Sequence, residues 1–342
     1  MRNWIQTLLC ALGAATWLWS GTTCRADLRI LSVADDVTSE FYQAYNREFA
    51  AYWKKKTGDT VTVSQPRDGS SGPAQSVLNG LEADVVAMNR ALDIDVLHSD
   101  GKLIPANWAA RLPNQSVPCT STIVFVVRQG NPKNIRNWND LVETNISLVI
   151  PSPKTSSNGR YSYLAAWGYA LKKSAGDEQQ AREFVAKLFA NVPVLDVGGP
   201  GAIKTFVNYR IGDVLLTFEN EAALVQARFP TNQLQVVLPR VSILAENPVT
   251  WVDDEVRRHH TEAISRAYVE YLYSDAAQEL AAQHFFRPKN PAILARYATR
   301  YKPVELLTVN EIAGGWEKAQ QVHFADGGIF DQIHQRHRPH KS

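Results

Sequence analysis

Residues 148–173 read LVIPSPKTSSNGRYSYLAAWGYALKK, and this stretch determines the fold class. Its apolar start predicts a short buried strand over Leu148–Ile150, and its Leu- and Ala-rich end predicts a helix over Arg160–Lys173. The loop between them, Ser152–Gly159, consists mainly of small polar residues. A strand that runs through a loop into a helix is the repeating part of parallel sheets that are covered by helices on both faces. The stretch therefore favours an α/β fold.

The same order of strand, loop and helix recurs on both sides of this stretch. Leu28–Ala34 predicts a strand, and Thr38–Lys56 predicts a helix with aromatic residues at four-residue spacing on one face. Thr60–Ser64 predicts a second strand, which leads into a Gly- and Ser-rich loop and a helix from Pro73 to about Leu81. The further predicted strands are Ala83–Met88, Thr122–Arg128, Val194–Val197, Asp213–Thr217, Val236–Leu238 and Val249–Val252, and the further predicted helices are Ala202–Asn208, one beginning near Glu219, and Thr261–Tyr273.

The length of the chain favours two domains. Single hydrophobic cores stop growing near about 250–300 residues, and this chain has 342. The Pro- and Asn-rich segment Leu112–Pro118 marks the expected boundary. We expect two α/β lobes, with the chain crossing between them near Val117–Ser121 and Leu244–Asn247. The predicted division is a leader over 1–26, the first part of lobe 1 over 27–117, lobe 2 over 118–245, a return to lobe 1 with C-terminal helices over 246–330, and a polar tail over 331–342.

The first 26 residues have the pattern of a secretory signal peptide, with Arg2, an apolar stretch over Trp4–Trp19 and a run of small residues that ends at Ala26. We expect cleavage after Ala26 and export of the remaining chain. A membrane anchor is the alternative, but the apolar run is shorter than the roughly 20 residues that span a bilayer. A lipoprotein acylated on Cys24 is a second alternative, although Gly21 stands where a Leu-like residue is expected.

Charge and cysteine content exclude several classes of protein. The formal net charge is +2, and removal of Arg2 and Arg25 with the leader would bring it to 0, so nucleic acid is not an expected partner. The aromatic and apolar content excludes a disordered chain. Cys119 would be the only cysteine left, which rules out an intramolecular disulfide, and we expect it to be a small buried apolar residue.

Four loops that each precede a predicted helix share one composition. They are rich in Gly, Ser, Thr and Asn, and the N–H groups at a helix start have no intrahelical acceptor. Such starts bind anions without a cationic side chain, because the helix dipole places a partial positive charge there. For any one loop, ordinary helix capping explains the composition equally well. Their recurrence favours an anion-binding protein, and the loops are Ala34–Thr38, Gly69–Gly72, Thr155–Gly159 and Gly198–Gly201.

The chain also resembles a known family along almost its whole length, from Leu28 to about Gln332. The stretches that carry the resemblance are Gly80–Val86, Thr120–Phe125, Gly130–Lys133, Pro153–Arg160, Tyr163–Gly168, Gly212–Leu215, Ile243–Glu246 and His323–Gly328. They resemble the periplasmic sulfate- and thiosulfate-binding proteins of bacterial ABC transporters. The resemblance implies a two-lobed periplasmic-binding-protein fold of type II with the ligand in the cleft between the lobes. It also implies a monomer without enzymatic activity or cofactor, which delivers its anion to inner-membrane ABC permease subunits.

The resemblance implies a set of ligand contacts, which we carry over position by position. In the first two loops, Asp36 is expected to contribute its backbone N–H and Ser70 its hydroxyl. The third loop would contribute N–H groups and a hydroxyl from the start of its helix, and the fourth would contribute the position of Gly199. The expected ligand-binding residues are Asp36, Ser70, Ser156, Ser157, Asn158, Gly199 and Phe218.

Three departures from the sulfate-binding pattern bear on specificity. Phe218 stands where sulfate binders have a Trp, and Phe has no N–H to donate to an oxygen. Ser157 and Asn158 replace glycines, and Pro200 replaces an Arg. The thiosulfate-binding branch also has Phe at the first position, so we expect thiosulfate to be favoured, with a sulfate-preferring protein as the alternative. A wall of donors without a free carboxylate would also exclude monoprotonated phosphate, whose O–H would lack an acceptor.

Two functions from other classes of protein remain as alternatives. An exported hydrolase is the first, although the chain has no G-x-S-x-G or H-E-x-x-H motif. Metal binding is the second, since His334, His337 and His340 are spaced three apart, although a solvated tail explains them more simply. Arg160 is expected to have a structural role as an ion-pair or capping residue.

Overall fold

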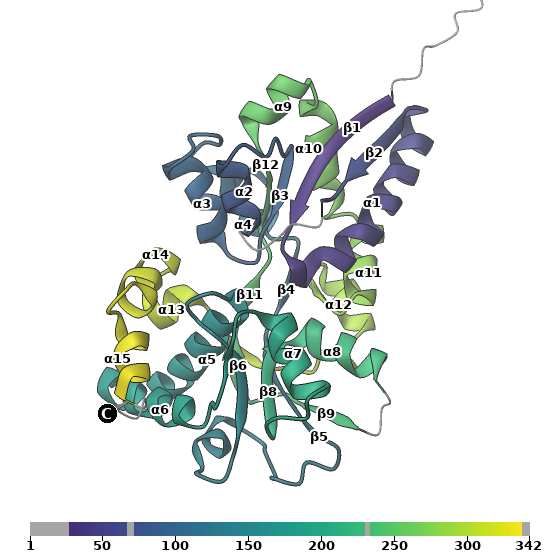
Figure 1. The fold of residues 1–342 in the computed structure, drawn as a ribbon. Helices are drawn as coiled ribbons and strands as arrows, with labels where there is room; N and C mark the ends of the chain where they lie inside the picture. Colours follow the sequence, from purple (N-terminus) through teal and green to yellow (C-terminus); the bar gives the residue numbers. More distant parts are fainter. Residues whose placement is uncertain (1–26, 67–71, 230–232, 337–342) are drawn as a thin grey trace, which may run out of the picture.

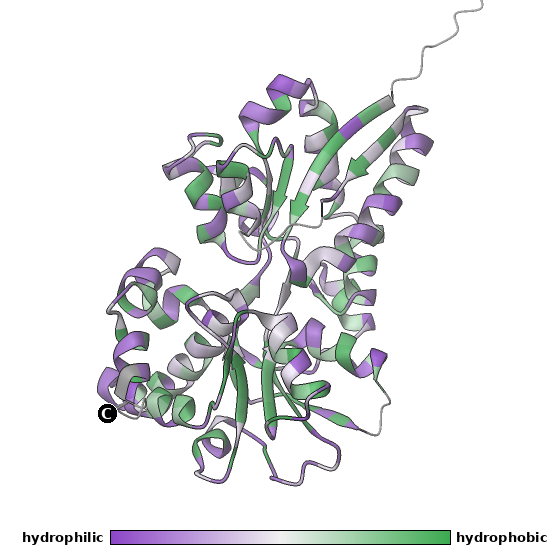
Figure 2. Ribbon diagram, viewed as in Figure 1, coloured by the Kyte–Doolittle hydropathy of each residue, from purple (hydrophilic) through white to green (hydrophobic). Residues whose placement is uncertain are grey.

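The computed structural model of the chain describes residues 27–66, 72–229 and 233–336, which form two α/β lobes joined by a narrow waist (Figure 1). The predicted α/β class is confirmed. Figure 2 shows that the strands of both lobes are mainly hydrophobic, whereas the helices carry hydrophilic residues on their outer turns. Among the described residues, no helix is both long and apolar enough to cross a membrane. The predicted signal peptide lies outside the described residues.

The first lobe is built on a four-stranded sheet in the order β12 (Val249–Trp251), β3 (Val85–Ala87), β1 (Asp27–Ala34) and β2 (Thr60–Ser64). β1 is parallel to β2 and β3, and β12 is antiparallel to β3. Alternate residues of β1 face opposite sides of the sheet, as a strand requires. Ile30 packs with α1 and Val33 with α2 and α3, so helices cover both faces. The helices of this lobe are α1 (Asp36–Thr57), α2 (Pro73–Leu78), α3 (Ala91–Ser99), α9 (Asp253–His259), α10 (Glu262–Tyr271), α11 (Asp275–Gln283) and α12 (Pro291–Arg296).

The second lobe has a five-stranded sheet in the order β7 (Leu195–Asp196), β6 (Leu148–Pro151), β8 (Val214–Phe218), β5 (Ile123–Arg128) and β9 (Leu234–Val237). β6 is parallel to β7 and β8, whereas β5 is antiparallel to β8 and β9. Phe125 points into the core beneath α5 and α6, and Val124 and Val126 point into the core beneath α7 and α8. These helices are α5 (Ser157–Lys173), α6 (Glu178–Ala190), α7 (Gly199–Val207) and α8 (Glu219–Arg228).

The waist consists of short strands in antiparallel pairs. β4 (Cys119–Ser121) lies between β11 (Ala245–Glu246) and β13 (Arg287–Pro288). Thr122 Oγ1 donates to the carbonyl of Ile243 at 2.8 Å, which ties the crossing segments together. Cys119 is buried in the waist, and burial raises the pKa of its thiol to about 12. This confirms the prediction that it is a small buried apolar residue.

The C-terminal segment packs on the second lobe. β14 (Glu305–Leu307) pairs in parallel with β10 (Val241–Ile243), and buried residues beyond it join the core beneath α5. The segment continues as α13 (Val309–Ala313), α14 (Trp316–Ala319), a π-helical turn over Gln320–Phe324, and α15 (Ile329–Arg336). Other short turns lie at Trp108–Arg111, α4 (Pro113–Ser116) and Trp138–Val142.

In the second lobe, two helix starts differ from their predicted positions in a way that affects the site. α5 begins at Ser157 instead of Arg160, and α7 begins at Gly199 instead of Ala202. The residues between were predicted as loop because Ser, Asn, Gly and Pro disfavour helix interiors, yet these residue types are tolerated in a first turn. The expected loop residues therefore carry the free N–H groups of helix starts themselves.

A buried histidine in the C-terminal segment should make stability dependent on pH. His323 is 4% exposed, and its Nδ1 lies 3.0 Å from the hydroxyl of Tyr163. Burial lowers the pKa of its imidazole from 6.5 to about 4. Because the folded-state pKa is lowered, this stability is present above about pH 6.5 and is lost as the pH falls towards 4. We expect this group to lower the free energy of unfolding by about 2–3 kcal/mol between pH 7 and pH 4.5.

Urea unfolding of the wild type and of His323→Gln at the two pH values measures this effect. Gln keeps a polar group near Tyr163 but does not titrate in this range. The variant should lose less stability on acidification, and the same loss in both proteins would contradict the assignment.

Candidate functional site

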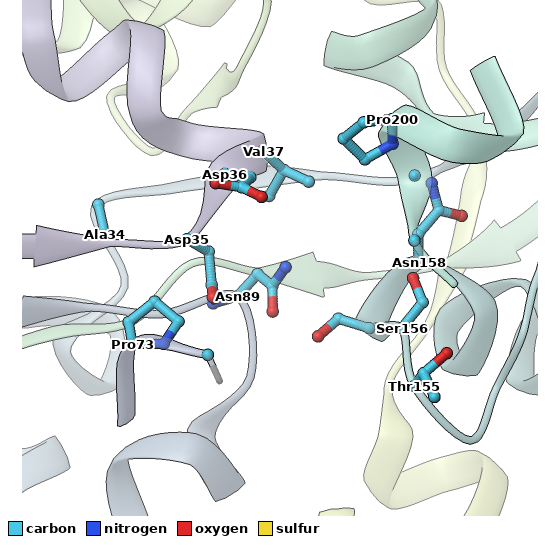
Figure 3. A pocket seen from close by; sticks show the side chains of 14 residues that line it. Ala34, Asp35, Asp36, Val37, Pro73, Asn89, Thr155, Ser156, Asn158 and Pro200 are labelled. Carbon is cyan, nitrogen blue, oxygen red and sulfur yellow. The ribbon is translucent and has the colours of Figure 1, made fainter. Parts of the chain in front are cut away.

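A cavity of about 210 Å³ lies between the lobes, where strand ends meet helix starts (Figure 3). Ligands of open α/β sheets bind at such carboxyl ends of strands. No Lys, Arg or His is among the described residues that line it. The lining residues are Ala34, Asp35, Asp36, Val37, Gly72, Pro73, Asn89, Thr155, Ser156, Ser157, Asn158, Gly198, Gly199 and Pro200.

The second lobe contributes two helix N-termini to the cavity wall. Ser156 is the N-cap of α5, and its hydroxyl accepts from the N–H of Gly159 at 3.4 Å. Gly198 is the N-cap of α7 and has no side chain to cap the helix. The first N–H groups of both helices have no intrahelical acceptor, so they are available to a ligand. Both helices are long enough, at 17 and 9 residues, for their dipoles to favour an anion at this end.

The side chain of Asn158 is bonded to other protein groups, so it does not serve as a ligand contact. Its Nδ2 donates to Thr217 Oγ1 and to Glu221 Oε2, both at 2.9 Å, and its Oδ1 accepts from Ser162 at 3.2 Å. Burial raises the pKa of Glu221, although the hydrogen bonds from Thr217 and Asn158 oppose this shift. Asn158 therefore joins α5 to α8 through its side chain and leaves its backbone N–H for the cavity.

Close packing and two partly buried cationic side chains hold the loop that precedes α5. A Cβ on Gly159 would lie 2.3 Å from the carbonyl oxygen of Pro151, so only Gly allows α5 to approach the end of β6 this closely. Arg160 Nε donates to the carbonyl of Pro153 at 2.8 Å, in agreement with the structural role expected for it. On the other side of the loop, Lys154 Nζ donates to the carbonyl of Phe324 at 3.0 Å.

The first lobe contributes the start of α1 and the partly buried carboxyl group of Asp35. Asp36 is exposed at the first position of α1, and Asp35 precedes it as the N-cap. Asp35 Oδ2 accepts from the backbone N–H of Asn89 at 2.6 Å. Burial, together with the charge of Asp93, raises the pKa of Asp35 to about 7, although the bond from Asn89 and the charge of Arg90 oppose the shift. The prediction of a wall without a carboxylate is therefore wrong, because it considered only the backbone of this loop.

Most of the predicted site residues lie together in this cavity. Phe218 does not line it: the side chain is 2% exposed, and its ring packs edge-on against Tyr161 at 5.4 Å between centroids. Ser70 lies outside the described residues. The residues that line the cavity as predicted are Asp36, Ser156, Ser157, Asn158 and Gly199.

Among the lining residues that were not predicted as ligand contacts, three have polar side chains, namely Asp35, Asn89 and Thr155. Asp35 and Thr155 are within loops that the sequence analysis had singled out, but they were not named as contacts. Asn89 follows the predicted strand Ala83–Met88, and its position at a strand end was the available signal.

No metal centre is formed within the part of the chain that the structure describes, where no group of three His, Cys, Asp or Glu side chains is placed to hold an ion. His334 lies in α15, and the other two tail histidines, His337 and His340, lie outside the described residues.

A two-lobed α/β chain with a donor-lined cleft has the architecture of a solute-binding protein, and comparison with known proteins agrees. Residues 36–287 match the family described as bacterial extracellular solute-binding protein. The chain is 47% identical to a thiosulfate-binding protein of Pseudomonas aeruginosa, over 98% of this chain and 99% of that protein. It is 45% identical to a sulfate-binding protein of Salmonella typhimurium, over 98% of this chain and 100% of that protein.

A solved structure gives the same result. The sulfate-binding protein SubI from Mycobacterium tuberculosis superimposes with a TM-score of 0.74 at 30% identity, covering 86% of this chain and 98% of that one. The chain therefore belongs to the family of bacterial sulfate- and thiosulfate-binding proteins, and the expected resemblance is confirmed.

The close approach at Gly159 gives a testable consequence. In Gly159→Ala the new Cβ would overlap the backbone at Pro151, so α5 must shift, and we expect the free energy of unfolding to fall by about 1–3 kcal/mol. Gly198→Ala is a matched control, because its Cβ would meet only Pro200 Cδ at 3.8 Å and its φ of −155° is open to any residue. Urea unfolding should separate the two variants, and equal stabilities would contradict the packing argument.

Proposed function

We propose that the chain is the periplasmic solute-binding component of an ABC importer for sulfate and thiosulfate. The observation that carries this proposal is the meeting of the starts of α1, α5 and α7 at one cavity without a cation among its described lining residues. Backbone N–H groups at helix starts bind a fully ionised anion, which needs donors only. Two curated relatives bear the names of a thiosulfate-binding and a sulfate-binding protein, which supports this choice of ligand.

The ligand contacts that we propose follow the cavity wall. Asp36 offers its backbone N–H from the first lobe, and Ser156 offers its hydroxyl from the second. The starts of α5 and α7 offer N–H groups at Ser157, Asn158 and Gly199, and Ser70 completes the set.

We further propose that thiosulfate binds more tightly than sulfate. Phe218 brings no donor to the site, and a missing hydrogen bond to a charged oxygen costs on the order of 1.5–3 kcal/mol. The terminal sulfur of thiosulfate is a weaker acceptor than oxygen, so thiosulfate would lose less binding energy where no donor is offered. The contact of Phe218 with Tyr161 supports this preference, because it holds the ring in the core, where Phe218 offers the cavity no N–H group.

Binding is proposed to involve closure of the lobes about the waist, as in other two-lobed binding proteins. Contacts that cross between the lobes support this motion. Tyr161 Oη donates to the carbonyl of Asn89 at 3.0 Å, and Asn220 Nδ2 donates to the carbonyl of Val37 at 3.2 Å. These two hydrogen bonds would be broken in an open form, so they stabilise the closed form relative to the open one.

The remaining parts of the proposal concern location and partners. The chain would be exported by its signal peptide, act as a monomer without catalysis or cofactor, and deliver its anion to inner-membrane ABC permease subunits. The solute-binding names of the relatives support a non-enzymatic role.

Calorimetric titration of the protein without residues 1–26 tests the ligand. We expect micromolar or tighter binding of thiosulfate, weaker binding of sulfate, and still weaker binding of molybdate. Phosphate belongs in the same series because Asp35 lies in the wall. Absence of micromolar binding for every anion would contradict the proposed function, and a preference for sulfate would contradict only the proposed specificity.

Asp35 should make anion binding depend on pH. With a pKa of about 7 it is part-ionised in the free protein, and a bound dianion raises this pKa further by repulsion. Protons are then taken up on binding, so affinity decreases as the pH rises. Between pH 6 and pH 8 we expect the dissociation constant for sulfate, which stays a dianion throughout, to increase by up to about tenfold.

Asp35→Asn removes this titration and keeps an oxygen that can accept from Asn89. The affinity of this variant for sulfate should change little between the two pH values. That result would assign the pH effect to Asp35 and not to the other charged groups near the cleft, which are Asp36, Asp93, Arg90 and Glu221. A wild-type affinity that does not vary with pH would contradict the assignment.

A further inference from the structure

Asn89 occupies a fixed position in the first-lobe wall of the cavity. It follows β3, and its side chain extends towards the lobe that carries Ser156 and Asn158 (Figure 3). Its backbone N–H donates to Asp35 at 2.6 Å, and its carbonyl accepts from Tyr161 of the other lobe at 3.0 Å. Because both main-chain groups are bonded, the direction of the side chain is set by the surrounding structure.

The side-chain oxygen of Asn89 lacks a hydrogen-bond partner among the described residues. The residue is 5% exposed, and its Oδ1 is buried without a hydrogen bond to any described residue. Leaving such a group unbonded costs about 1–3 kcal/mol. Buried side-chain polar atoms are nearly always paired in folded proteins, so an exception at a cavity wall indicates a group that meets a ligand.

The chemistry of the amide matches an anion. Rotation by half a turn about the last side-chain bond exchanges the oxygen and the nitrogen, which have almost the same size, so the ligand selects the atom that faces it. A fully ionised oxyanion has only acceptors and selects the N–H group. The neighbouring carboxylate of Asp35 has no proton to donate when ionised, and Phe218 has no donor at all. Above the pKa of Asp35, Asn89 is thus the described side chain of the first-lobe wall that can donate a hydrogen bond.

We propose that Asn89 is an anion-binding residue, whose side-chain amide donates an N–H to the bound anion from the lobe opposite the starts of α5 and α7. This rests on the proposed function and adds a contact to it. The anion then bridges the lobes through a neutral side-chain donor on one side and helix N-termini on the other.

Titration calorimetry with thiosulfate and with sulfate, on wild type, Asn89→Ala and Asn89→Asp at pH 8, tests the contact. We expect Asn89→Ala to raise the dissociation constant about 5- to 30-fold, in line with the loss of one hydrogen bond to a charged acceptor. Asn89→Asp has nearly the same shape but replaces the donor by a negative charge, so its loss should exceed that of the Ala variant.

Asn191→Ala is the matched control, because its amide donates to the carbonyls of Leu141 and Glu143, away from the cavity. It should bind both anions as the wild type does. Thermal midpoints of all variants establish that they are folded. If Asn89→Ala is unstable, Asn89→Asp and the spectroscopic test below decide whether Asn89 contacts the anion.

Proton–nitrogen correlation spectra give a direct readout. The side-chain NH₂ signals of Asn89, identified by their absence in Asn89→Asp, should move downfield on addition of thiosulfate. Wild-type affinity in either Asn89 variant, or side-chain signals that do not move while the wild type binds, would overturn the Asn89 contact and leave the proposed function standing. Failure of the wild type to bind either anion would instead remove the proposed function itself.

Discussion

The structure depends on one electrostatic constraint, which is that free N–H groups of several helices must point at one small volume. Each helix start contributes only its first few N–H groups, and the dipole effect declines within the first turn. The starts must therefore be brought close together, which the parallel strands achieve because their carboxyl ends open on the same edge of a sheet. The carbonyl oxygen of Pro151 lies so close to Gly159 that the position of the α5 start can vary very little. A side chain as small as a methyl group there would displace the start of α5.

One partly buried and one buried carboxyl group, those of Asp35 and Glu221, stand beside this anion site, although like charges repel. Asp35 accepts from the backbone of Asn89, and Glu221 accepts from Thr217 and Asn158. Each acid thus orients a residue of the cavity wall, and the raised pKa of each lowers the negative charge that a dianion would meet. Asp35 within the wall and Glu221 behind it are thus hydrogen-bonded to residues that line the cavity.

The sequence predicted the parts of this arrangement that depend on local pattern. Alternating strands and helices predicted the α/β class, and Gly- and Ser-rich loops predicted the position of Ser156 and Gly199 at one cavity. The helix starts were displaced by three residues because first-turn residues resemble loop residues in composition. The roles of Asn158 and Asn89 could not be predicted, since they depend on partners that are distant in sequence: Glu221 for the one, and the hydroxyl of Tyr161 for the other. Phe218 was expected to reach the ligand, but packing against Tyr161 holds its ring in the core.

The lysine that holds the loop before α5 has a consequence for the order of folding. Lys154 donates to the carbonyl of Phe324 and to the carboxylate of Asp331, at sequence separations of 170 and 177 residues. Such distant contacts form late, because a long loop must close before they stabilise anything. The loop that carries Ser156 therefore gains its last support only when the end of the chain has been made and has folded back. A chain that is still being synthesised holds this loop without its anchor, so the capacity to hold an anion is completed together with the molecule as a whole.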